Sequence, residues 1–154
     1  MSSTRRIFIR EASRFTGGLA VAVFVPSILH AGCTSSTASY EFNHDGVISL
    51  PDWKLGDCEL KQASLHISGN FIILNSQVCT HFTHTKDVWH MTVDVFTRDN
   101  TDPSKIIPLG TGKMDGPQMS EQDHPLFHSW NARFGFNTTA AKGHRIAAKV
   151  TSCC

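Results

Sequence analysis

The feature of this chain that most constrains its fold is a two-residue alternation of apolar and polar side chains. This period is typical of a strand with one buried face, whereas a surface helix would repeat every three or four residues. Residues 61–67 alternate in this way, and the turn residues 68–70 separate them from an apolar run at 71–78. The two runs therefore predict a β-hairpin.

Other segments repeat the strand pattern, and no segment shows a convincing helical period. Residues 88–97 alternate most clearly, and the face that carries Trp89 is predicted to be the core face. Further strands are expected at 130–136 and 146–150. These runs, about six or seven in all, predict an all-β fold, either a single antiparallel β-sandwich or a small barrel.

Glycine and proline mark the expected loops. Residues 106–109 predict a short edge strand that Pro108 interrupts, because proline lacks the N–H that a sheet ladder needs. Residues 110–125 hold three glycines and two prolines and are predicted to be the longest loop.

The N-terminal segment resembles the twin-arginine export signal. Thr4 occupies the Ser/Thr position, Arg5 and Arg6 are the paired arginines, Phe8 follows, and Ile9-Arg10 replaces the usual Leu-Lys. Residues 15–29 are uncharged, but this stretch is too short and too rich in glycine for a transmembrane span. We therefore expect residues 1–38 to be a signal peptide that engages the twin-arginine translocase. Residues 39–154 would form one periplasmic or secreted β-domain without a transmembrane anchor.

The cleavage site is predicted after Ala38, where Ser36 and Ala38 are the small residues at −3 and −1. A cut after Ala31 would place the larger Leu29 at −3. Cys33 follows Ala31-Gly32 as a lipidated cysteine would, but His30 stands where leucine is usual. Lipid anchoring at Cys33 is therefore not favoured.

The charge of the expected mature chain gives no reason to predict a polyanionic partner. Removing residues 1–38 leaves 14 − 4 = 10 basic and 13 − 1 = 12 acidic side chains, a net charge of −2. Nucleic acid is therefore not expected as a partner. The remaining 154 − 38 = 116 residues suffice for one domain with a modest core.

Cysteine count points to disulfides. With Cys33 removed or lipidated, an oxidising compartment would receive four cysteines: Cys58, Cys79, Cys153 and Cys154. A bond between the adjacent Cys153 and Cys154 would close a strained ring. We therefore predict two bridges that tie this pair to Cys58 and Cys79. A thiolate metal site is the alternative, although the paired Cys-x-x-Cys spacing is missing.

Histidine is the second unusual feature of the chain. His81, His84 and His90 lie close together in the sequence, with Asp87 between them. Imidazoles are common ligands for zinc and copper, and a carboxylate can serve as fourth ligand or orient a ring. These four residues are the predicted metal site. The alternative is that the histidines are surface and loop residues without a ligand.

Residues 41–52 resemble a calcium loop, with oxygen-bearing side chains at loop positions 1, 3, 5, 9 and 12 and Gly46 at position 6. Position 1 is Glu41 and position 12 is Asp52, both departures from the usual residues, and neither flank looks helical. A turn that leads into a strand at 47–50 is the preferred interpretation, and calcium is a less favoured cofactor than zinc or copper.

The sequence carries little that is typical of an enzyme. The chain has no Gly-x-Ser-x-Gly elbow, Ser-x-x-Lys pair, phosphate loop or dinucleotide fingerprint. No catalytic residue is predicted.

The mature part also resembles an uncharacterised family of small exported bacterial proteins. The resemblance rests on Gly56-Asp57-Cys58, on the alternating strand at 60–67 and on the His-rich run 81–90, and it implies no activity. Two classes of function stay open. The favoured one is a non-catalytic binding module for a small ligand, a metal ion or an envelope protein. The other is a metal-dependent enzyme that uses the histidines as ligands.

Overall fold

The computed structural model of the chain describes residues 27–30, 33–81, 87–119 and 126–154, and it forms ten strands over those residues. Nothing in these ranges is a helix able to cross a membrane. The strands are β1 (Ser27–His30), β2 (Cys33–Glu41), β3 (Val47–Ser49), β4 (Trp53–Leu55), β5 (Cys58–Ser68), β6 (Phe71–Thr80), β7 (Asp87–Arg98), β8 (Ile106–Met119), β9 (His128–Gly135) and β10 (Ile146–Cys153).

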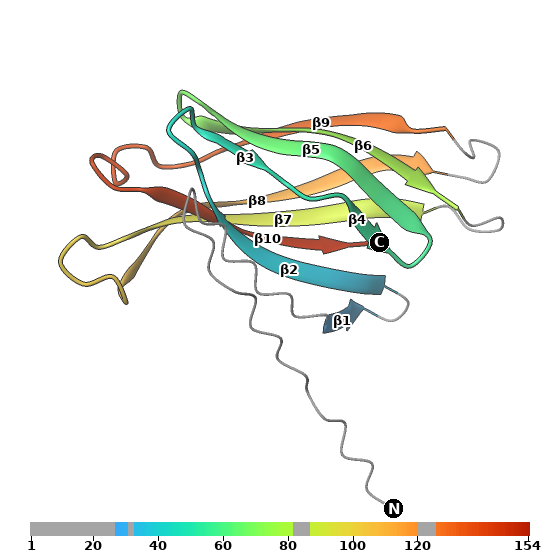
Figure 1. Cartoon of the computed structure of the whole chain (residues 1–154), viewed down its shortest axis with the longest axis horizontal. Coiled ribbons are helices and arrows are strands. Elements are labelled where there is room, and N and C mark those ends of the chain that lie inside the picture. The colour runs from blue at the N-terminus through green and yellow to red at the C-terminus, as the bar shows by residue number, and fades with distance from the viewer. Residues whose placement is uncertain (1–26, 31–32, 82–86, 120–125) are drawn as a thin grey trace, which may run out of the picture.

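The strands form two antiparallel sheets that pack face to face (Figure 1). Sheet A has the order β1-β2-β10-β7-β8, and sheet B has the order β3-β5-β6-β9, with β4 also paired to β5. The two sheets do not close into one continuous ladder. The predicted all-β sandwich is therefore confirmed, and the barrel alternative is not what forms.

The core lies between the sheets and comes from alternate residues of each strand. Trp89, Met91, Val93 and Val95 of β7 are all at most 1% exposed, which confirms that the Trp89 face is the core face. The facing sheet contributes residues that are fully buried, namely Leu60, Leu65, Ile72, Leu74 and Val78. The period-two pattern thus maps directly onto the inner faces of a sandwich.

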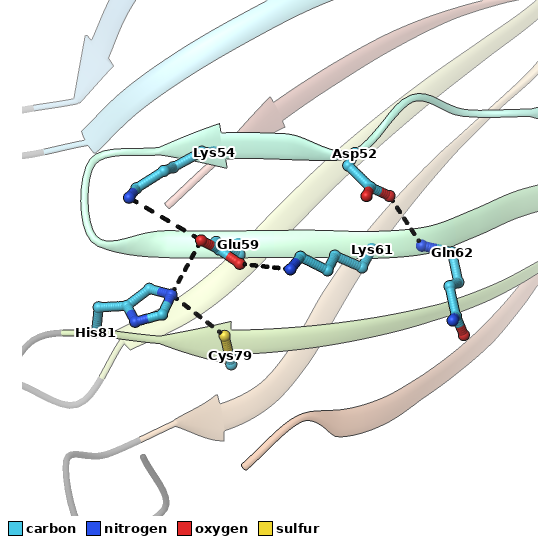
Figure 2. Close-up of polar contacts among 7 residues, drawn as sticks. All are labelled: Asp52, Lys54, Glu59, Lys61, Gln62, Cys79 and His81. Carbon is cyan, nitrogen blue, oxygen red and sulfur yellow. Dashed lines mark hydrogen bonds and ion pairs between the residues drawn. The ribbon is translucent and has the colours of Figure 1, made fainter. Parts of the chain in front are cut away.

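The predicted hairpin is also confirmed, as β5 and β6 with Ser68 opposite Phe71. A β-bulge interrupts β5 between Lys61 and Ser64, and Gln62 there has a φ of 52°. The Gln62 N–H donates to Asp52 Oδ1 at 3.2 Å (Figure 2). Because the bulge adds one residue, Leu60 and Ala63 both face the core although they are three positions apart.

The predicted loop at 110–125 is wrong over residues 110–119, since β8 continues as a strand from Ile106 to Met119. Pro108 is tolerated because β8 is an edge strand of sheet A and itself bulges beside the proline, between Pro108 and Gly110, opposite Val95 and Phe96. Residues 120–125 lie outside the described residues.

The two disulfides correct the predicted pairing. Cys58 is bonded to Cys154, and Cys153 is bonded to Cys33, whereas Cys79 is a buried free thiol. The Cα–Cα distances of the bridges are 5.9 Å for Cys33–Cys153 and 6.2 Å for Cys58–Cys154. Both distances lie in the usual range for a disulfide.

Strand geometry explains why the adjacent cysteines choose different partners. Successive side chains of a strand point to opposite faces. Cys154 continues the β10 ladder, since its N–H donates to the Thr34 carbonyl at 3.2 Å. Cys153 therefore faces outward beside the neighbouring strand β2, while Cys154 faces the core and reaches Cys58 of sheet B. One bridge links neighbouring strands and the other links the two sheets.

The predicted domain boundary after Ala38 falls inside β2. Residues 35–41 of this strand pair with β10, and Ala38 itself is fully buried. A cut after Ala38 would remove Cys33 and two thirds of the strand. The bond to Cys153 also occupies the Cys33 thiol that lipidation would require. A β-domain that keeps both disulfides includes residue 33.

Tyr40 is expected to ionise well above the usual range for tyrosine. Burial raises the pKa of Tyr40 to about 12 from 10.0, because the low-dielectric core disfavours the phenolate. The contribution of the neutral Tyr40 phenol to the free energy of unfolding is then fully present below pH 10.0. It is lost as the pH rises towards about 12. The chain has one tyrosine, so ultraviolet absorbance of the phenolate reports this residue alone. A midpoint near pH 10.0 in the folded protein would contradict the prediction, and Tyr40→Phe, which removes the signal, is the control.

Candidate metal centre

Three chemically reactive side chains meet on the outer face of sheet B, where β5 begins and β6 ends (Figure 2). Glu59 of β5 lies directly opposite Cys79 of β6, and His81 follows β6 by one residue. Their strand neighbours Cys58, Leu60 and Val78 face the core. Alternation therefore places Glu59 and Cys79 on the outer face.

One atom of each side chain converges on the same point. His81 Nε2 lies 3.1 Å from Glu59 Oε1 and 3.7 Å from Cys79 Sγ. All three ligand atoms lie within 4.8 Å of one another. In a tetrahedral zinc site with metal–ligand bonds of about 2.0 to 2.3 Å, neighbouring ligand atoms are about 3.3 to 3.6 Å apart. The observed spacing is close to that of a coordination shell.

Charged and aromatic neighbours surround the cluster. Lys61 Nζ lies 3.2 Å from Glu59 Oε2, the oxygen that does not contact His81, and Lys54 Nζ is 4.0 Å from Glu59 Oε1. The ammonium group of Lys61 also lies 5.1 Å from the centre of the Phe127 ring. Lys61 can thus hold one carboxylate oxygen while the other stays available to a metal.

The surroundings of the cluster lower the pKa of Glu59 and raise the pKa of Cys79. The hydrogen bond from Lys61 lowers the pKa of Glu59, and the nearby charges of Lys61 and His81 lower it further against the effect of burial. Burial raises the pKa of the Cys79 thiol, and the Glu59 carboxylate adds to this shift. At neutral pH the site therefore holds a carboxylate and a protonated thiol.

The arrangement does not match a cysteine–histidine–carboxylate relay for nucleophilic catalysis. In such a relay the carboxylate holds one ring nitrogen and the thiol contacts the other. Here Glu59 and Cys79 both approach Nε2 of His81. Convergence of three donors on one side of the ring suits an ion shared between them.

Of the predicted metal ligands, the structure brings only His81 into this cluster. His90 faces outward from sheet A, on the far side of the core, and its Nδ1 lies 2.6 Å from Asp115 Oδ1. Asp87 Oδ2 accepts a hydrogen bond from the Thr80 hydroxyl at 2.6 Å. Two packed sheets separate His81 from His90, so these two rings do not share an ion. His84 lies outside the described residues.

The segment that resembles a calcium loop forms a turn. Asn43 Oδ1 accepts hydrogen bonds from the backbone N–H groups of Asp45 and Val47, at 3.0 and 2.8 Å. Gly46 supplies the positive φ of 71° that the turn needs before β3. The Asx-type hydrogen bonds use the oxygen that the calcium interpretation would assign to the ion, so the turn interpretation is confirmed.

Fold and cluster together define a class of protein: a β-sandwich with a disulfide between its sheets and a three-donor cluster on one outer face. Comparison of the chain with protein-family models, with curated proteins and with solved structures found no match. The resemblance to small exported bacterial proteins therefore stays a prediction, and any function has to be argued from the site itself.

Proposed function

We propose that this protein is an exported β-sandwich that binds one transition-metal ion, zinc or copper, through Glu59, Cys79 and His81. The observation that carries the proposal is that the three donor atoms already lie within 4.8 Å of one another. Little rearrangement is then needed on binding, and the ion would replace the proton of the Cys79 thiol.

The donor set also favours these metals on chemical grounds. A thiolate and an imidazole suit zinc and copper, whereas magnesium and calcium prefer oxygen ligands alone. Three protein ligands leave one tetrahedral position for water or for a small ligand. A binding module would hold the ion or present it to an envelope partner. The metal-dependent enzyme would use the same open position, and substrate turnover that requires the metal would distinguish it.

The two disulfides of the domain support the proposal that it is exported. Two disulfides indicate an oxidising, extracytoplasmic environment. We propose that the chain reaches it by the twin-arginine route, on the basis of residues 4–10, which lie outside the described residues. This route moves folded proteins, so it suits a domain that acquires its metal before export, and equally a small domain that folds rapidly.

The first test is the metal content of the protein recovered after export through its own N-terminal segment, purified without chelator or affinity tag. We expect about one zinc or copper ion per chain. The Cys79→Ser/His81→Ala variant should lose more than about a hundredfold in metal affinity, because it removes two of the three ligands. Elemental mass spectrometry and titration with zinc or Cu(I) measure the two quantities.

His66→Ala is the matched control, since His66 is a β5 residue outside the cluster and contacts Ser64 Oγ at 2.8 Å. The control should bind metal like the parent chain. Equal metal content in the parent, the cluster variant and the control would overturn the proposal. The intact mass of the same preparation shows whether residue 33 is retained.

A further inference from the structure

A second group of reactive side chains lies on the outer face of sheet A. Asp115 of β8 is opposite His90 of β7, and His90 is opposite Cys153 of β10. Cys153 is bonded to Cys33 of β2. Asp115, His90 and Cys153 therefore form one row across three neighbouring strands, and the disulfide extends to Cys33, two residues from the β2 residue that pairs with Cys153.

In this row the carboxylate and the cysteine lie on opposite sides of the imidazole, whereas in the metal centre both approach the same ring nitrogen. Asp115 Oδ1 lies 2.6 Å from Nδ1 of His90, which leaves Nε2 on the other side of the ring. Side chains directly opposite each other in an antiparallel pair have Cβ atoms about 4.5 to 5.5 Å apart, within reach of a long side chain. The imidazole can therefore stand between the carboxylate and the Cys153 sulfur.

The two disulfides differ in access. Cys33 and Cys153 are both partly exposed, and the side chains of His90 and Asp115 are 54% and 75% exposed. Cys58 of the other bridge is only 2% exposed, and its partner Cys154 is partly exposed but packs against the core. A thiol that approaches from solvent can therefore attack either sulfur of the Cys33–Cys153 bond, whereas the Cys58 sulfur of the bond between the sheets is shielded.

We propose that Cys33–Cys153 is a thiol–disulfide exchange site, in which His90 gives a proton to the leaving sulfur of Cys153 and Asp115 positions the ring. The substrate class is a dithiol. Its first thiolate attacks Cys33 Sγ, a mixed disulfide forms, and the Cys33–Cys153 bond breaks. The Cys153 sulfur leaves with the bonding electron pair and takes a proton from His90 Nε2.

In the second step, the remaining thiol of the dithiol attacks the dithiol's own first sulfur, which is bonded to Cys33 in the mixed disulfide. This attack releases Cys33, which is protonated from water. The dithiol is oxidised to a disulfide, and the protein bond is reduced to two thiols. Two electrons pass to the protein, and the two protons lost by the dithiol are balanced by those gained at Cys33 and Cys153. A protonated His90 speeds this step because it makes the departing thiolate a better leaving group.

Several charged groups of the described residues share this face with His90. Asp115 lies opposite it, and Lys113 is one row along β8. Asp94 of β7 and Lys149 of β10 lie two rows away and oppose each other. Asp115 is thus the charged group that directly contacts the His90 ring.

The test uses the full chain that retains Cys33, dithiothreitol as the dithiol, and alkylation followed by mass spectrometry to count each reduced bond. Cys33–Cys153 should be reduced at least about tenfold faster than Cys58–Cys154. His90→Gln should slow the reduction of Cys33–Cys153 about tenfold near neutral pH and leave the other bond unchanged. Asp115→Asn should slow the reduction of Cys33–Cys153 several-fold, because the ring loses the carboxylate that positions it, and Asp115→Glu, which keeps a carboxylate, should restore most of the rate.

A merely structural effect of His90→Gln would change the reduction rates of both bonds, and Asp115→Glu would not restore a rate that depends on folding alone. His66→Gln is the control and should react like the parent chain. Equal rates for the parent and His90→Gln at every pH, or earlier reduction of Cys58–Cys154, would overturn the proposal. Neither outcome depends on whether Glu59, Cys79 and His81 bind a metal.

Discussion

Replacing Cys58 and Cys154 together by alanine is expected to lower the free energy of unfolding by about 3 to 4 kcal/mol. Because Cys33–Cys153 already ties residue 153 to residue 33, this bridge closes a further loop of roughly 25 residues in the unfolded chain (58 − 33 = 25). It is also the disulfide that links the two sheets, whose described residues contact each other mainly through side-chain packing. Urea denaturation without reductant measures the change.

Cys79→Ala is the matched control for this experiment, because it removes a buried cysteine that forms no disulfide. Its cost should be no more than about 1 to 2 kcal/mol, the cost of a small cavity. If the double variant were no less stable than this control, the bridge between the sheets would not restrain the chain as expected.

Gly112→Ala is expected to destabilise the protein by about 2 to 3 kcal/mol. Gly112 lies on the inner side of β8, opposite Val93, and an added Cβ would overlap the ring of Phe134 in β9. This is where an edge strand of sheet A approaches an edge strand of sheet B. The aromatic ring can pack there because the glycine has no side chain.

A double-mutant cycle with Phe134→Leu checks the cause of this effect. Part of the cost of Gly112→Ala should disappear in the Phe134→Leu background, because the smaller side chain can move aside. Gly135→Ala is the control, since its Cβ would meet only the Asn70 carbonyl oxygen at 3.8 Å and should cost little. Strict additivity of the two changes would show that the ring contact is not responsible.

The candidate metal centre depends on a feature that apolar periodicity cannot reveal. Counting back from the predicted hairpin turn, with Ser68 opposite Phe71, would place Leu60 opposite Cys79. The bulge between Lys61 and Ser64 shifts the register by one residue and places Glu59 there instead. Where a bulge forms is decided by contacts such as the Gln62 N–H to Asp52, which come from a different strand connection.

Histidine spacing was similarly a partial guide. It selected His81, which lies in the candidate cluster, but proximity in the sequence suggested that His90 would join it. The chain passes from sheet B to sheet A between these residues, so the rings face opposite sides of the sandwich. The signal that could have found Glu59 and Cys79 was their position just beyond the open end of the predicted hairpin, whose strands were expected at 61–67 and 71–78.

The amino-acid sequence by itself determined the all-β class, the hairpin of β5 and β6 and the core face of β7, because strand alternation is local and burial of one face enforces it. Only the tertiary structure decided that β8 runs through its glycines, that Cys33 and not Cys79 forms a disulfide, and that Glu59 joins Cys79 and His81. Each of these outcomes depends on which strands become neighbours, on a bulge, or on the packing of one sheet against the other. Those are contacts between residues far apart in the chain, and a local pattern does not encode them.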